Sequence, residues 1–304
     1  MTSDLGRKFS LISFVSLIMI LTSIFAATSD RVLTRGYFRI VHAVEDSAYC
    51  AQVSAVLNSA LQEVTQDLQL PPPDTMMVYL APDRRAFLGF SRGQLPRWAQ
   101  AFAIPTRQLM VLKSPRWDRS EGDGSATAAH ELVHLLLHKK TRGRKIPRWL
   151  DEGLAIFYSG EKRWQTATAI SKGTVTDSLI PLDQIDWVLD FHRSKAELAY
   201  QQSYSAVHYL LRWYDIEAVR IILDGIREGR DLDESFQLAT GSTFAEFERE
   251  WTAYAQKAYQ WLWLSEFDDL LWIPILLLTF AVFVILRLRN RRRIREWEEL
   301  SEAE

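Results

Sequence analysis

The chain contains a single cysteine, Cys50, among its 304 residues. One cysteine cannot form an internal disulfide, and it cannot build a metal site that needs several thiolates. We expect Cys50 to be a small buried apolar residue rather than a reactive thiol. The chemistry of the protein must therefore come from other side chains.

An excess of charge of either sign is also missing, because the formal net charge is -2 at pH 7. A strong basic field of the kind that attracts nucleic acid is therefore absent, and we expect no nucleic-acid partner. The chain also shows no internal repeat and no low-complexity stretch.

A long apolar run near the N-terminus, from Phe9 to Ala27, contains no charged residue and follows Arg7 and Lys8. Its length suits a membrane span. The small-x-small pattern of a signal-peptide cleavage site is poorly formed in "SIFAATS". We therefore favour an uncleaved anchor at residues 9–27 over a removed signal peptide.

A second apolar run, Leu270 to Leu286, predicts a transmembrane helix between an acidic stretch and six arginines in the following tail. The positive-inside rule then places the tail, residues 287–304, in the cytoplasm. A buried core helix is the alternative, which the arginines disfavour. Two spans would make this a bacterial plasma (inner) membrane protein whose middle part, between the spans, is extracytoplasmic, with the lipid bilayer as a partner.

The part between the two runs predicts an α+β fold. The first subdomain, residues 35–113, shows strand patterns at 35–42 and 75–81, helical patterns at 46–68 and 83–90, and two short strands around the turn "IPTRQ". The second subdomain, residues 114–264, is helical. Its expected helices span 125–141, 147–159, 195–212, 214–227, 231–239 and 243–263.

The stretch "TAAHELVHLLLHKK", Thr127 to Lys140, places His130 and His134 four residues apart on an expected helix. Both imidazoles then lie on one helix face and can reach the same ion. Glu131 lies beside them and is suited to act as a general base. His138 is a third ligand, a rival, or a residue that interacts favourably with the helix C-terminus. An HExxH match also arises by chance, so a third ligand is needed.

The third ligand is expected in "KIPRWLDEGLAIFY", Lys145 to Tyr158. Glu152 follows His134 by 18 residues and stands in an otherwise apolar stretch. Burying an unpaired carboxylate is costly, and a bound metal would remove that cost. The neighbouring Asp151 projects about 100° away on a helix, so we expect it at the surface or paired with Arg148.

These two stretches together, "HELVH" and "IPRWLDEGLAIFY", resemble the peptidase-MA-like gluzincins, which are small HExxH metallopeptidases with a distal glutamate ligand. Two later stretches, residues 198–223 and 234–251, also resemble helices of that family. The likeness covers roughly residues 35–255 and is strongest over 126–160. It implies a small gluzincin-type domain with a mixed sheet and a helical half.

The resemblance implies a zinc site and a role for each matching residue. His130, His134 and Glu152 would bind Zn²⁺, and Glu131 would activate the zinc-bound water. Tyr200 would donate a hydrogen bond to the developing oxyanion, and Tyr204, one turn later, is the alternative donor. Either tyrosine could instead serve only in core packing. A strand near Gln108 to Leu112 would form the sheet edge that receives an extended peptide.

One position departs from the family pattern. Larger gluzincins place an aspartate four residues after the glutamate ligand, where it orients the first histidine, and this chain has Ile156 there. The orienting group must then come from elsewhere or be a backbone carbonyl.

The function expected from these observations is a membrane-anchored zinc metallopeptidase that hydrolyses extracytoplasmic peptides or proteins. A non-catalytic, zinc-stabilised membrane receptor or scaffold with a gluzincin-like fold is the alternative, although a purely structural site has no use for Glu131. A chance HExxH match in a helical adaptor protein is a third possibility, which the presence of Glu152 in the segment Lys145 to Tyr158 disfavours.

Overall fold

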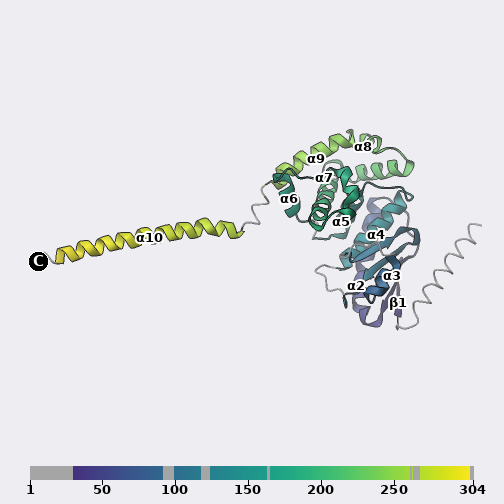
Figure 1. Ribbon diagram of the computed structural model, residues 1–304. Helices are drawn as coiled ribbons and strands as arrows, with labels where there is room; N and C mark the ends of the chain where they lie inside the picture. Colours follow the sequence, from purple (N-terminus) through teal and green to yellow (C-terminus); the bar gives the residue numbers. More distant parts are fainter. Residues whose placement is uncertain are drawn as a thin grey trace, which may run out of the picture. The chain divides into compact units, whose positions relative to one another are not determined.

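The computed structural model describes residues 30–91, 99–117, 124–162, 165–260, 262 and 268–301 (Figure 1). The predicted N-terminal anchor, residues 9–27, lies outside these residues. The chain divides into two units, one made of residues 1–166 and 180–251 and the other of residues 167–179 and 252–304. The first unit contains the sheet and the HExxH helix.

A five-stranded mixed sheet forms in the first unit, in the order β1-β2-β3-β5-β4. The three central strands, β2 (Phe38–Ala43), β3 (Met76–Ala81) and β5 (Leu109–Lys113), are parallel to one another. The outer strands, β1 (Asp30–Arg35) and β4 (Ala101–Ile104), pair antiparallel with β2 and β5. The α+β class is therefore confirmed.

The edge strands of the sheet are β1 and β4, so the expected edge near Gln108 to Leu112 is wrong. That segment is β5, which pairs with β3 on one side and β4 on the other. The cause is the tight turn between the strands, a 3₁₀ turn at Pro105–Arg107 followed by Gln108 with φ of 48°. This left-handed residue reverses the chain and places β4 outside β5.

Both faces of the sheet are covered, because successive strand side chains point to opposite sides. One face packs on Phe87 of α3 (Arg84–Ser91) through in-register residues of three strands: Val41, Tyr79 and Val111. The other face contributes a fully buried row, Ile40, Val78 and Met110. Helices α2 (Ser47–Asp67) and α4 (Gly124–Lys140) contact the strands and each other.

The helical part follows the predicted order with α5 (Arg148–Ser159), α7 (Arg193–Glu228), α8 (Leu232–Thr240) and α9 (Phe244–Tyr259). The two helices expected at 195–212 and 214–227 form the single element α7, which is broken internally at Asp215 (φ 62°, ψ 174°). The sequence patterns missed β1, α6 (Thr168–Val175) and the 3₁₀ segment η3 (Leu182–Asp190).

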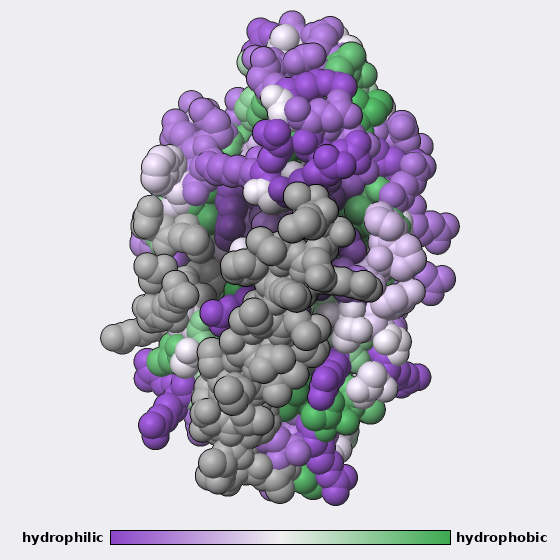
Figure 2. Space-filling view, turned by 90° about the vertical axis from the view of Figure 1, so that its right-hand side faces the viewer, coloured by the Kyte–Doolittle hydropathy of each residue, from purple (hydrophilic) through white to green (hydrophobic). Residues whose placement is uncertain are grey.

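Aromatic packing fixes α5 within the helical part. Trp149 is fully buried and stacks with Phe244 and Phe247 of α9, with ring centroids 6.0 and 5.8 Å apart. Phe236 of α8 completes this cluster, with its centroid 6.3 Å from that of Trp149. The coloured residues on the face shown in Figure 2 are mostly hydrophilic, with apolar residues at several separate places among them.

The predicted C-terminal membrane span is wrong. Residues 270–286 belong to the helix α10 (Asp268–Ser301). Within the described part of the chain, no helix combines the length and apolar character that crossing a membrane requires. The uncharged run of 17 residues rises about 25 Å as a helix, against roughly 30 Å of hydrocarbon. The predicted inner-membrane localisation depended on this span and is therefore also wrong.

Helices α5 and α7 meet at Gly153 without an intervening side chain. A Cβ atom built on Gly153 would lie 2.3 Å from the backbone oxygen of Ser203 and 2.5 Å from Cγ2 of Val207. A backbone oxygen cannot rotate out of the way as a side chain can, so this close approach requires glycine.

We predict that Gly153→Ala lowers the free energy of unfolding by about 1–3 kcal/mol, because the methyl group forces α5 and α7 apart. Chemical denaturation monitored by circular dichroism measures this change. The matched control is Gly89→Ala in α3, where a Cβ meets nothing within 4 Å. This control gains up to about 1 kcal/mol of helix propensity. Equal stability of both variants and the wild type would show that the contact between α5 and α7 does not exclude a side chain at position 153.

Candidate metal centre

The helix α4 carries both motif histidines on a face turned away from its apolar side. Its alanines and leucines favour a helix, and the side that packs into the fold is fully or nearly fully buried: Ala128, Ala129, Leu132, Val133, Leu136 and Leu137. His130 and His134 are half-buried, and their ring centroids lie 4.8 Å apart. The predicted one-turn spacing therefore places both imidazoles side by side.

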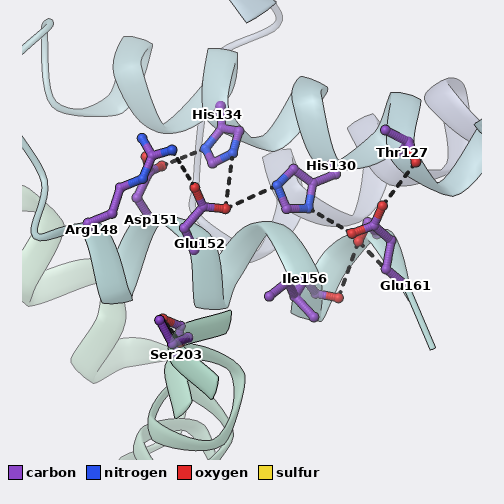
Figure 3. A network of polar contacts seen from close by, with 11 residues as sticks. Thr127, His130, His134, Arg148, Asp151, Glu152, Ile156, Glu161 and Ser203 are labelled. Carbon is purple, nitrogen blue, oxygen red and sulfur yellow. Dashed lines mark hydrogen bonds and ion pairs between the residues drawn. The ribbon is translucent and has the colours of Figure 1, made fainter. Parts of the chain in front are cut away.

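Helix α5 packs against α4 and brings Glu152 to the two histidines (Figure 3). Oε2 of Glu152 lies 3.2 Å from Nε2 of His130 and 3.6 Å from Nε2 of His134. The three potential ligand atoms all lie within 4.8 Å of one another. His138 is in the last turn of α4 and lies beside Gly143, which follows the helix. It does not belong to the group of three potential ligands.

The second oxygen of Glu152 is held by Arg148, one helical turn earlier. Nη2 of Arg148 lies 2.6 Å from Oε1 of Glu152, whose side chain is 3% exposed. Burial alone would raise the pKa of Glu152, but the charges of Arg148 and His134 and the hydrogen bond with His130 lower it well below its usual range. Glu152 is therefore an ionised carboxylate with Oε2 directed at the histidines.

Asp151 contacts the opposite side of His134. Nδ1 of His134 donates a hydrogen bond to Oδ1 of Asp151 over 2.9 Å. The expectation that Asp151 lies at the surface or pairs with Arg148 is therefore wrong. Successive residues of α5 approach His134 from two sides, so that Asp151 faces one ring nitrogen and Glu152 the other.

Glu161, which the sequence patterns did not identify, lies on the corresponding side of His130. Its Oε2 is 3.1 Å from Nδ1 of His130, and its Oε1 accepts a hydrogen bond of 3.0 Å from Thr127. Burial opposes ionisation, but the nearby His130 and the hydrogen bonds of His130 and Thr127 lower the pKa of Glu161. The only hint in the sequence is an acidic residue directly after the helix-ending Gly160.

The donor set fits a metal ion. A carboxylate at each Nδ1 favours the tautomer with hydrogen on Nδ1 and a lone pair on Nε2. In that tautomer two Nε2 lone pairs would face an anionic oxygen of Glu152, so the arrangement needs either protons on the histidines, as in the hydrogen bond from His130, or a metal ion between the three atoms. Donors about 2.1 Å from a tetrahedral zinc are about 3.4 Å apart. The distances of 3.2 and 3.6 Å agree with this geometry.

The same electrostatics affect the histidines themselves. Burial by itself would lower the pKa of His130 and of His134. The negative charges of Glu161 and Glu152, with their hydrogen bonds, together raise the pKa of His130 by more than burial lowers it. At His134 the charges of Asp151 and Glu152 and the hydrogen bond with Asp151 together have the same net effect on the pKa. The cluster therefore favours positive charge at its centre, in the form of protons or a metal ion.

Glu131 lies next to His130 on α4 and is half-buried. Burial raises its pKa above the usual value, although the positive charges of His134 and His130 oppose this shift. A raised carboxyl pKa suits a group that takes up a proton and then releases it.

The structure distinguishes the two candidate tyrosines on α7. Burial and the charge of Glu152 raise the pKa of Tyr200, and Arg148 and Glu131 are also close enough to affect it. The pKa of Tyr204 is raised by burial, and its ring packs on His208 with centroids 5.9 Å apart. The charge of the potential metal ligand Glu152 therefore reaches Tyr200.

The comparison with known families agrees with this geometry. A family model described as the peptidase MA superfamily matches residues 96–257, which is more than half of the 304 residues. The matched segment includes α4, α5 and α7, and it points to a metallopeptidase. The comparison with curated proteins gave no match. The resemblance seen in the sequence is thus confirmed, and the chain belongs to the peptidase MA superfamily.

Proposed function

We propose that the protein is a zinc-dependent metallopeptidase that hydrolyses peptide bonds. In this proposal His130, His134 and Glu152 bind the zinc and Glu131 is the general base. The observation that carries the proposal is that one ring nitrogen of each histidine and one oxygen of the buried Glu152 all lie within 4.8 Å of one another. Membership of the peptidase MA superfamily supports the peptidase activity.

The choice of zinc follows from the ligand chemistry. Two imidazoles and one carboxylate leave the fourth tetrahedral position open, which is the arrangement of catalytic zinc sites. When bound, the zinc supplies a Lewis acid that polarises the scissile carbonyl and lowers the pKa of water. Arg148 contributes by holding Oε1 of Glu152, which leaves Oε2 as the single ligand atom of that carboxylate.

Glu131 and Tyr200 have complementary roles in the proposed reaction. Glu131 takes the proton of the attacking water and passes it to the leaving amine, a transfer for which its raised pKa is suitable. The Tyr200 hydroxyl donates a hydrogen bond to the carbonyl oxygen as negative charge develops there. A phenol with a raised pKa keeps the proton that this donation requires.

The outer strand β4 supports a peptide as the substrate. It is the last strand of the sheet and contacts α4, which carries the histidines. An extended peptide that pairs with β4 would run along the metal centre with its backbone held by main-chain hydrogen bonds.

We predict that the full chain binds one zinc ion and that Glu152→Ala removes or greatly weakens this binding, because one of three ligands is lost. Metal content after dialysis, measured by mass spectrometry, tests this prediction. Glu63→Ala, which changes an exposed glutamate on α2, is the matched control and keeps the zinc. A well-folded wild-type chain that binds no zinc would refute the proposed function.

We predict that Glu131→Gln retains the zinc but slows peptide hydrolysis by about 10²- to 10⁴-fold, because the amide cannot accept the proton. Turnover of a fluorogenic peptide library and zinc content are measured on the same preparation. Cleavage by this variant at the wild-type rate would show that Glu131 is not the general base.

We predict that Tyr200→Phe lowers kcat by about 10²- to 10³-fold with little change in KM, because the hydroxyl acts in the transition state. Tyr204→Phe serves as the matched control on the same helix and retains near wild-type kcat. The reverse order of effects would assign the oxyanion role to Tyr204.

A further inference from the structure

The departure at Ile156 raises the question of which group orients His130. Ile156 is fully buried, and its side chain has no atom that can accept a hydrogen bond. The Nδ1 atom of His130 is itself buried. A buried ring nitrogen without a partner is costly, so a nearby acceptor is needed.

An acceptor within reach of this atom is supplied by the chain just beyond α5. The helix ends at Ser159, and Gly160 adopts the left-handed conformation with φ of 66°. This residue turns the chain out of the helix. Glu161 follows directly, and its Oε2 lies 3.1 Å from Nδ1 of His130 (Figure 3).

A second contact fixes the carboxylate of Glu161 against α4. Thr127 precedes His130 by three residues, so both side chains lie on the same helix face. The Thr127 hydroxyl donates to Oε1 of Glu161 over 3.0 Å, while Oε2 faces His130. The two oxygens of Glu161 therefore have separate partners on α4, and the side chain is only 15% exposed.

The arrangement at His134 shows what this contact does. Nδ1 of His134 donates to Asp151, and Nε2 faces Glu152. At His130 the same order holds, with Glu161 on Nδ1 and Glu152 on Nε2. Glu161 thus lies on the side of the imidazole away from the other ligand atoms, which places it outside the ligand set.

We propose that Glu161 is the positioning residue of His130, which holds the imidazole with Nε2 toward the metal and replaces the aspartate that is missing at position 156. This inference depends on the proposed zinc site. A zinc ion bound at Nε2 would then have His130 between itself and the carboxylate of Glu161. The resulting carboxylate–histidine–metal arrangement strengthens the ligand.

The test is the zinc affinity of the full chain, measured by competition with a chromogenic chelator. We expect Glu161→Ala to weaken zinc binding by about 10- to 100-fold, and Glu161→Gln to weaken it less because the amide oxygen still accepts a hydrogen bond. Thr127→Val, which frees the carboxylate from its second contact, weakens it by about 2- to 10-fold. Glu63→Gln is the matched surface control and has wild-type affinity.

Nitrogen-15 spectra of the zinc-bound histidines separate positioning from general damage to the fold. Glu161→Ala should shift the Nδ1 resonance of His130 and leave that of His134 in place. Wild-type zinc affinity in Glu161→Ala would overturn the inference while leaving the metal site intact. Equal shifts at both histidines would also overturn it, and a wild-type chain without zinc would instead reject the proposed function.

Discussion

The buried carboxylate of Glu152 is the constraint on which the arrangement of the site depends. An ionised carboxylate inside a protein is tolerated only when cations and donors surround it, because its desolvation costs several kcal/mol. Arg148 occupies one oxygen and the two histidines surround the other. The packing of α4 against α5 meets this requirement, because it brings both imidazoles to the same oxygen.

Charge alternates outward from this carboxylate. The histidines surround Glu152, and further carboxylates, Asp151 and Glu161, contact the outer nitrogens of the histidines. Such alternation lowers the energy of each buried group and orients the imidazoles before any ion arrives. The site is thus largely preorganised by groups that would not themselves touch the ion.

The main features of the fold and the ligand set were predictable from the sequence, because they depend on periodicity. Helix geometry alone is enough to interpret the one-turn spacing of His130 and His134. The same holds for Glu152, an acidic residue within an apolar segment. The contacts of Asp151 and Glu161 depend instead on the packing of α5 and on the turn at Gly160. The order of β5 and β4 similarly depends on the left-handed Gln108, whose conformation is not visible in a pattern of apolar residues. The prediction of a C-terminal membrane span failed because it relied on apolar composition where the length of the run was marginal.

The contact at Gly153 has a consequence for the motions of the site. The backbones of α5 and α7 touch at Ser203, and neither chain can slide past the other without breaking this fit. The helix of Glu152 and the helix of Tyr200 should therefore move as one rigid body on the timescale of substrate entry. A displacement of α5 that moved Glu152 would then carry α7, and with it Tyr200, along in the same motion.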